Sequence, residues 1–257
     1  MKIKTIILTI VTSIVTTECL AWGQVGHDTT CAIAEKHLSR RAKKKINKIF
    51  KGKSLVYWGN WLDNASHTPE HEDWKPWHYK NIEADQTYEE VPPAKAGDII
   101  TALNEQVSLL KSGKLSEEEE ALALKMVIHF LGDLHQPFHL GRYADYGGNL
   151  VKLTVFGKER NLHALWDEDI VDYAHRWTYT EWVEQIDRTS KQERKTIGQG
   201  TFDDWARETF EICKGIYADT PAGSEISYDY IAKYTPVVEQ QLLKGGIRLA
   251  RVLNEIF

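Results

Sequence analysis

The chain has 257 residues, with 32 lysines and arginines against 37 aspartates and glutamates, and a formal net charge of −5 at pH 7. This length is enough for one sizeable domain with a substantial core. The negative balance argues against a protein that binds duplex nucleic acid in a broad basic groove. It favours small or flexible substrates that are held locally.

The first 21 residues have the pattern of a secretory signal peptide. Lys2 and Lys4 precede a short apolar run, and small residues end at Ala21. That run is shorter than the ~20 residues that span a bilayer. Cleavage after Ala21 would remove two lysines and one glutamate, which leaves Trp22 as the first residue and a net charge of −6. We therefore expect a secreted or periplasmic mature protein, residues 22–257, which is monomeric and free of the membrane.

The predicted elements are mostly helical. Apolar residues recur at helical steps over 33–50 and 99–110. The segment 117–135 begins with four glutamates, which favour a helix N-terminus, and continues as a nearly all-apolar helix. Residues 150–156 alternate loosely and end at Gly157, as a short strand or hairpin does.

The last third of the chain predicts two further helical regions. Residues 202–216 form one helix, and residues 231–256 form one or two helices with Gly245 and Gly246 as a weak point. No repeat or low-complexity linker is present. The sequence thus predicts a mainly α, single-domain multi-helix bundle with a short β-hairpin.

Two cysteines, Cys31 and Cys213, remain after the predicted cleavage. In an exported protein they can pair as one disulfide, or each can be a small buried core residue. The sequence leaves both alternatives open.

The segment from His129 to His139 holds three histidines and an aspartate among apolar residues. His129 and Asp133 are four residues apart, so they share one face of a helix, and His139 follows Pro137, where a helix normally stops. Imidazoles and a carboxylate that converge in this way suit zinc. The alternative is a buried helix with ordinary structural histidines. His135 points elsewhere on the helix and is expected to be structural.

Further histidines and aspartates occur in recognisable patterns. His163 and Asp167 form a second pair one helical turn apart. The other patterns are Trp22 with His27, Trp61-Leu62-Asp63, Trp77-His78-Tyr79, and Gly147-Gly148-Asn149 before the predicted strand.

Together these motifs resemble the zinc-dependent type I nuclease family, which includes mung bean nuclease and the fungal single-strand-specific nucleases, within the phospholipase C/nuclease superfamily. Order and spacing match from Trp22 to Asp167, and the rest of the chain is similar only as a helical scaffold. The resemblance implies a phospholipase C/nuclease-like fold and three zinc ions per chain. It assigns the first ion to Asp63, His78, His129 and Asp133, the second to His139, His163 and Asp167, and the third to His27, Asp133 and the amino nitrogen and carbonyl oxygen of Trp22.

The same resemblance implies an endonuclease that cleaves single-stranded DNA and RNA to 5′-phosphate products and removes phosphate from 3′-nucleotides. Zinc lowers the pKa of bound water towards 7, which supplies the nucleophile. Asp63 and Asp133 are the expected catalytic carboxylates at the metals, and Glu83 or Asp85 is the acidic group that assists them. Asn149 and Asp169 are the expected substrate-binding residues.

This chain departs from the family pattern at two positions. Ser66 replaces a basic residue, and Asp169 replaces an asparagine that helps to bind a base, so phosphate contact and base preference are open. Two rival functions also remain, a zinc-dependent phospholipase C and a zinc-binding protein without catalysis. The interval from His139 to His163 favours the nuclease.

Overall fold

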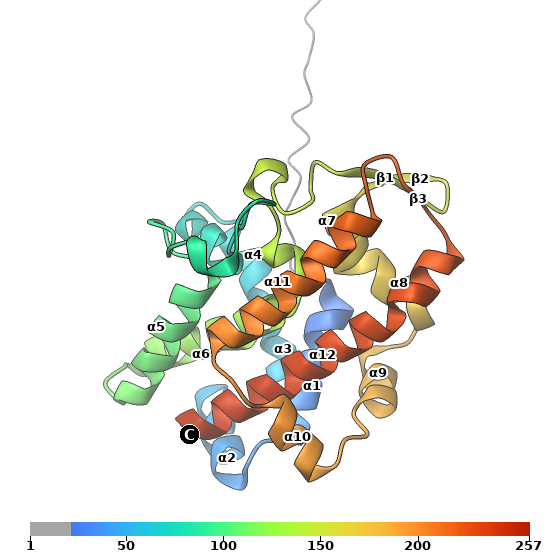
Figure 1. Ribbon diagram of the computed structural model, residues 1–257. Helices are drawn as coiled ribbons and strands as arrows, with labels where there is room; N and C mark the ends of the chain where they lie inside the picture. Colours follow the sequence, from blue (N-terminus) through green and yellow to red (C-terminus); the bar gives the residue numbers. More distant parts are fainter. Residues whose placement is uncertain (1–21) are drawn as a thin grey trace, which may run out of the picture.

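The computed structural model describes residues 22–257, and the predicted signal peptide lies outside them. About 67% of the structure is helical, which confirms the predicted mainly α fold. Figure 1 shows long helices that cross one another, with a small sheet at one edge. The helices of eight or more residues are α1 (Gln24–Lys36), α2 (Arg40–Ile49), α5 (Ile99–Ser112), α6 (Glu117–Asp133), α9 (Tyr179–Ile186), α11 (Phe202–Asp219) and α12 (Tyr228–Ile256).

Shorter helical segments connect these helices and carry several of the predicted metal ligands. They are α3 (Leu55–Trp58), α4 (Trp61–Ser66), η1 (Glu72–His78), η2 (Tyr88–Glu90), η3 (Pro137–Leu140), η4 (Tyr143–Asp145), α7 (Leu162–Ala164), η5 (Leu165–Asp169), α8 (Ile170–His175) and α10 (Lys191–Ile197).

The start of α6 is fixed by a reciprocal cap. The Ser116 hydroxyl accepts from the backbone N–H of Glu119, and the Glu119 carboxylate accepts from the N–H of Ser116. Such a cap satisfies two backbone donors that the helix leaves unpaired. The helix then runs to Asp133 and buries almost its whole second half. This local chemistry places His129 and Asp133 deep in the protein.

Helix α12 is one continuous helix of 29 residues, although the sequence marks Gly245-Gly246 as a weak point. The two glycines allow a close approach to α1. A β-carbon on Gly246 would lie 2.5 Å from Cβ of Ile33, and one on Gly245 would lie 3.1 Å from Cγ2 of Thr30. The packing of α12 on α1 therefore explains the glycines, and the helix passes through them unbroken.

The predicted hairpin is part of a three-stranded sheet. Strand β1 (Lys152–Val155) pairs antiparallel with β2 (Lys158–Asn161), with Val155 opposite Lys158. The sheet gains a third strand, β3 (Glu225–Ile226), which pairs parallel with β1. This strand lies in the loop before α12 and has only two residues. So short a segment has no alternating pattern of apolar and polar residues that would predict it.

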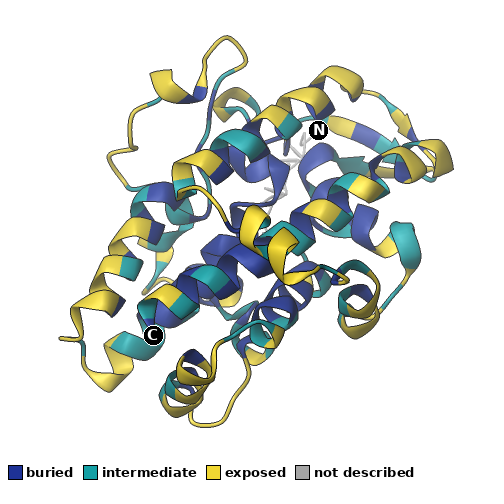
Figure 2. Cartoon of the chain, turned by 60° about the horizontal axis from the view of Figure 1, so that its bottom comes forward, coloured by how far each residue is buried: buried dark blue, intermediate teal, exposed yellow. Residues whose placement is uncertain are grey.

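Apolar side chains form two buried clusters. One surrounds Phe130 and Leu103 between α5 and α6, and the other surrounds Trp166 and Phe138. Figure 2 shows buried residues along the inner faces of the helices and exposed residues along the outer faces. Cys31 lies in the first cluster and Cys213 in the second, and both are free thiols. Among residues 22–257, no helix has the length and apolar character needed to cross a membrane.

Candidate metal centre

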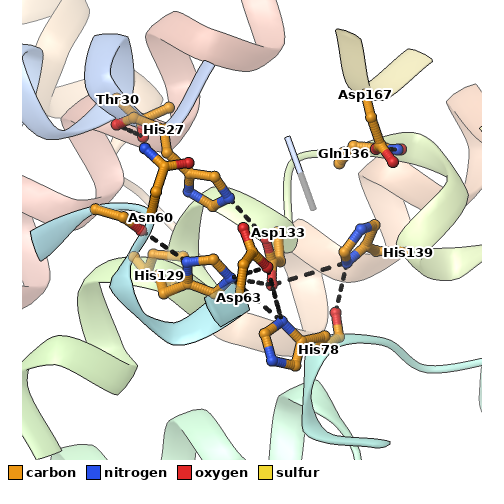
Figure 3. A network of polar contacts seen from close by, with 12 residues as sticks. His27, Thr30, Asn60, Asp63, His78, His129, Asp133, Gln136, His139 and Asp167 are labelled. Atoms are coloured by element: carbon orange, nitrogen blue, oxygen red, sulfur yellow. Dashed lines mark hydrogen bonds and ion pairs between the residues drawn. The ribbon is translucent and has the colours of Figure 1, made fainter. Parts of the chain in front are cut away.

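The last turn of α6 supplies a histidine and a carboxylate to the centre of the site. Nε2 of His129 lies 3.3 Å from Oδ2 of Asp133, and both side chains are completely buried. Pro137 begins the 3-10 helix η3, which turns the chain back. Nδ1 of His139 consequently lies 3.8 Å from Oδ2 of Asp133. Figure 3 shows the rings of four histidines directed towards the carboxylates of Asp63 and Asp133.

The first group of potential ligands comprises Asp63, His78 and His129. Oδ1 of Asp63, on α4, lies 3.1 Å from Nε2 of His129. Nδ1 of His78, at the end of η1, lies 3.2 Å from that nitrogen and 2.9 Å from Oδ2 of Asp133. One ligand atom from each residue lies within 4.8 Å of the others, so the group has the dimensions of a single metal site.

A second group joins His27 of α1 to His129 and Asp133. Nε2 of His27 lies 3.2 Å from Oδ1 of Asp133. The His27 and His129 rings are stacked, with centroids 4.2 Å apart and an angle of 14° between their planes. Because Oδ1 of Asp133 faces His27 while Oδ2 faces His129 and His78, this carboxylate lies between the first two groups and can serve both.

The third group comprises His139, His163 and Asp167. Nε2 of His163 lies 3.0 Å from Oδ2 of Asp167. Asp167 belongs to η5, a short π-helical turn, which is a rare geometry that occurs often at functional sites. Gln136 donates from Nε2 to the other oxygen of Asp167, while its own carbonyl oxygen accepts from the N–H of Phe138.

Main-chain carbonyls fix three of the imidazole rings. Nδ1 of His129 donates to Gly59 O at 2.7 Å, Nδ1 of His139 donates to His78 O at 2.6 Å, and Nδ1 of His163 donates to Gly147 O at 2.7 Å. A carbonyl oxygen only accepts, so each Nδ1 carries the hydrogen and each Nε2 presents a lone pair when the ring is neutral. Metal-ligating histidines are oriented in this way.

Several buried polar atoms of the candidate ligands have no hydrogen-bond partner among residues 22–257. They are both ring nitrogens of His27, Nε2 of His78, Nε2 of His139 and Oδ1 of Asp133. Buried polar atoms are almost always satisfied, so a concentration of exceptions needs an explanation. Two of these atoms, Nε2 of His27 and Oδ1 of Asp133, lie 3.2 Å apart, and an imidazole nitrogen beside a carboxylate oxygen, both without partners, fits a zinc-like cation.

Burial and charge make the site receptive to a cation. Burial lowers the pKa of His27 and lowers that of His139 to about 4, which favours neutral rings. Burial opposes ionisation of Asp133, yet the neighbouring His129 and His139 hold its pKa well below the usual value. Burial also disfavours a charge on His129, but Asp133 and Asp63 raise its pKa well above the usual value. Asp63 and Asp133 thus stabilise a positive charge beside them, which either a proton on His129 or a metal ion can carry.

The structure brings together all eight histidine and aspartate side chains that the sequence predicts as ligands. Trp22, the ninth predicted ligand, is completely buried, and its β-carbon would lie 2.9 Å from a β-carbon on Gly26. The N–H of Gly23 donates to Asp167 O at 2.8 Å, which ties this end of the described chain to the third group. Coordination through the Trp22 amine stays a prediction.

A pocket of about 450 Å³ opens beside the third group. Asn149 is almost completely buried, and its amide nitrogen donates to Tyr146 O at 2.9 Å. Tyr143 and Tyr146 are well exposed at this pocket. The lining residues are Tyr79, Asn81, Phe138, Tyr143, Tyr146, Gly147, Asn149 and His163.

The remaining predicted site residues lie outside the three groups. Oε1 of Glu83 accepts from the N–H of Ala144 at 2.9 Å, whereas Asp85 is exposed. Asp169 accepts two hydrogen bonds of 2.7 Å from Arg160. Both oxygens of Asp169 therefore bind Arg160, and each keeps a lone pair that can accept a further hydrogen bond.

His135 has the structural role expected for it. Its Nδ1 lies 2.8 Å from Leu131 O, and its Nε2 lies 2.9 Å from Nη1 of Arg248, which can only donate. Sequence reasoning missed Gln136, the tyrosines of the pocket, and Gly132, whose lack of a side chain admits the His27 ring. The position of Gln136 directly before Pro137 in the histidine-rich segment was the only local signal.

Sequence comparisons relate this chain to known nucleases. The sequence pattern of the S1/P1 nuclease family matches residues 22–257. Endonuclease 2 of Arabidopsis thaliana is 29% identical over 92% of this chain and 90% of its own length. Nuclease S1 of Aspergillus oryzae is 28% identical over 91% of each chain, and nuclease P1 of Penicillium citrinum is 27% identical over 91% of this chain and 97% of its own.

Among solved structures, Clostridium perfringens alpha-toxin matches with a TM-score of 0.46 and 16% identity, over 93% of this chain and 64% of the toxin. That likeness is too weak to bear on function. The family match spans every described residue, and it includes all the side chains of the three groups. The chain therefore belongs to the S1/P1 nuclease family.

Proposed function

We propose that residues 22–257 form a trinuclear-zinc nuclease domain. Membership of the family makes the chain a nuclease, and the finer assignment rests mainly on the three buried groups, the first two of which meet at His129 and Asp133. The first zinc would be held by Asp63, His78, His129 and Asp133, the second by His139, His163 and Asp167, and the third by Trp22, His27 and Asp133.

Zinc in such a centre supplies a Lewis acid for phosphoryl oxygens and lowers the pKa of bound water. The protein's own contribution is to hold the donors rigidly. The carbonyls of Gly59, His78 and Gly147 orient three imidazoles, and Gln136 fixes the orientation of Asp167. Because these supports are buried backbone and side-chain groups, the ligand geometry is set before substrate binds.

The proposed substrates are single-stranded DNA and RNA, cleaved to 5′-phosphate products, and 3′-nucleotides. The potential ligands are inset, since every side chain of the three groups is buried. A base that is free of a duplex can enter the neighbouring pocket and stack on an exposed tyrosine, Tyr143 or Tyr146. Asn149 lies in the same pocket, where its amide is suited to contact a base or a sugar.

Glu83 is the better candidate for the assisting acid. It is half-buried, and its carboxylate holds the backbone of Ala144 in the segment that carries Tyr143 and Tyr146. Asp85 is exposed and contributes no such contact. We also propose that the mature protein is exported as a monomer after loss of residues 1–21.

A side-by-side assay tests this function against its two rivals. Purified protein is given single-stranded DNA, 3′-AMP and phosphatidylcholine micelles, and its zinc content is measured in the same preparation. Hydrolysis of the first two substrates, abolished by a chelator and restored by zinc, is the expected result. Hydrolysis of the lipid alone would identify a phospholipase C. Bound zinc without any hydrolysis would identify a zinc-binding protein.

A further inference from the structure

The segment 36–53, which contains α2, is strongly basic. It carries nine lysines and arginines and no aspartate or glutamate. The remainder of the chain then has 23 basic residues against 37 acidic residues. The basic residues are therefore concentrated in one segment, although the protein as a whole has a net negative charge.

The charges of α2 point away from the protein. Ala42 and Ile46 are buried on its inner side, and most of its basic residues are exposed. Lys45 pairs with Glu120 at 2.6 Å and Lys36 pairs with Asp187 at 2.9 Å. Within residues 22–257 no ion pair engages the other seven, which are Arg40, Arg41, Lys43, Lys44, Lys48, Lys51 and Lys53.

The side of α2 that faces the start of α6 is partly neutralised. Lys48 and Lys51 border a hollow there with Glu117 and Glu118. Arg40, Arg41, Lys43 and Lys44 do not line this hollow and form no ion pair within residues 22–257, so they are the stronger attraction for an anionic chain.

A ladder of aromatic and basic side chains continues from α2 along α3. Nζ of Lys53 lies 4.5 Å from the ring centroid of Tyr57, which is 58% exposed. The Tyr57 ring contacts Trp58 edge-on at 4.8 Å, and Trp58 contacts Trp61 at 6.4 Å. Nζ of Lys125, from α6, lies 3.7 Å from the Trp58 centroid and 4.0 Å from that of Trp61.

The chain segment that carries this ladder continues into the metal centre. Trp61 precedes Asp63 by two residues on the short helix α4, and the carbonyl of Gly59 accepts from His129. Figure 1 shows α2, α3 and α4 following one another from the lower end of the molecule towards the upper end. The same stretch of chain therefore links the basic helix to the candidate ligands.

We propose that α2, α3 and the start of α4 form a track that binds the single strand beyond the cleavage site. Phosphates lie along the lysines and arginines of α2, and bases stack on the Tyr57–Trp61 ladder, where Lys53 and Lys125 contribute positive charge. Interleaved cations and aromatic rings suit single strands because every base offers a ring face. The proposal rests on the proposed nuclease function and extends its substrate to long strands.

An anionic membrane is the competing partner for a basic helix. A helix that binds a bilayer surface inserts an apolar face between the lipids. The apolar face of α2 is already packed in the core through Ala42, Ile46 and Phe50. Only the charged side of α2 is therefore accessible, which favours a polynucleotide over a membrane.

The first test measures binding without cleavage. Fluorescence anisotropy gives the affinity of labelled dT20 in a His163→Ala background, so the result does not depend on activity. Adding Lys53→Gln, Tyr57→Ala and Lys125→Gln should weaken binding about tenfold, the scale of one lost stacking contact. Restoring Lys125 as arginine should recover part of that loss. Unchanged affinity in the triple variant would overturn the stacking track.

A matched control removes the same groups elsewhere. Tyr228, which is 81% exposed, is changed to alanine together with Lys111→Gln and Lys191→Gln. This control should bind dT20 as the parent does. An equal loss in the control would show that the effect is one of net charge, which would also overturn the proposal.

The second test concerns the phosphates. Arg40, Arg41, Lys43 and Lys44 are changed together to glutamine, and Lys111, Lys114, Lys191 and Lys195 form the control set. Each lost phosphate contact lowers the slope of log Kd against log salt by about 0.7. The α2 variant should have a flatter slope by roughly two units or more, and the control set should not. A parallel slope in the α2 variant would contradict the track.

Kinetics and lipid binding separate the remaining outcomes. In the otherwise unsubstituted enzyme, both track variants should raise KM for a long single strand and leave hydrolysis of 3′-AMP unchanged. Loss of binding to phosphatidylglycerol vesicles with full affinity for dT20 would assign α2 to a membrane and overturn the proposal. Failure of the parent to hydrolyse 3′-AMP or single-stranded DNA would refute the proposed function, while the dT20 affinities would still decide the track.

Discussion

Gly132 and His27 approach each other so closely that no side chain fits between them. A β-carbon on Gly132 would lie 2.6 Å from Nδ1 and 2.8 Å from Cε1 of the His27 ring. This contact joins α6 to α1, and the same His27 ring stacks on His129. The position of His27 beside Asp133 therefore depends on a glycine one residue before that aspartate.

We expect Gly132→Ala to displace His27 and to lower the metal content by about one ion per chain. Overpacking of this kind costs about 1–3 kcal/mol, which the higher helix propensity of alanine offsets only in part. Metal analysis and the thermal unfolding midpoint measure the two effects. Gly215→Ala in α11 is the control, because a β-carbon there meets nothing within 4 Å. Full metal content in the Gly132 variant would show that His27 is not a ligand.

His129→Ala should lose the first zinc and nearly all activity, and its stability should no longer respond to zinc, because metal binding at such sites is coupled to folding. His135→Ala, in the same segment, is the control for a loss of stability without a loss of a metal ligand. It removes a buried partner of Arg248 and should cost about 1–3 kcal/mol, but it should retain full zinc. If His135→Ala loses zinc as His129→Ala does, metal loss merely reports a disturbed fold.

An extra methionine before Trp22 should reduce zinc at the third site and lower activity. The α-amine can ligate only when it is free and deprotonated, and a metal pulls down its ordinary pKa of about 8. Mass spectrometry verifies the N-terminus, and metal analysis of chains with and without methionine gives the result. Full activity and full zinc in the extended chain would remove Trp22 from the ligand set.

Asp187→Asn should lower stability at neutral pH and have less effect in acid. Burial opposes ionisation of Asp187, but contacts with Lys36 and His37 hold its pKa below the usual value. A depressed folded-state pKa contributes stability above the unfolded value of about 4, and this stability is lost as the pH falls through the folded value.

Urea unfolding of parent and variant at pH 7 and pH 3, with chelator present in all samples, measures this loss. We expect a difference of about 1–2 kcal/mol at pH 7, since Lys36 is half-exposed, and a smaller one at pH 3. Glu184→Gln, an exposed neighbour, should show little difference at either pH. A difference that grows in acid would contradict the sign of this argument.

Apolar periodicity in the sequence predicted the long helices well. The segment 117–135 corresponds to α6, and 202–216 corresponds to most of α11. The region 33–50 contains two helices, α1 and α2, because Ser39 caps a new helix by accepting from the N–H of Ala42. The polar stretch 190–200 contains the short helix α10, which begins with a capping box at Ser190. Apolar periodicity alone does not reveal where such a cap begins a new helix.

The sequence by itself determined which residues share a helix face. The spacing of His129 with Asp133, and of His163 with Asp167, sets each pair within 3.3 Å because one helical turn separates its members. Only the tertiary structure decided that His27, Asp63 and His78, from α1, α4 and η1, meet the end of α6. It also decided that the two oxygens of Asp133 face different groups, and that α12 passes unbroken through its glycines. These outcomes depend on long-range packing, in which a missing β-carbon or a backbone carbonyl more than 50 residues away fixes the position of a side chain.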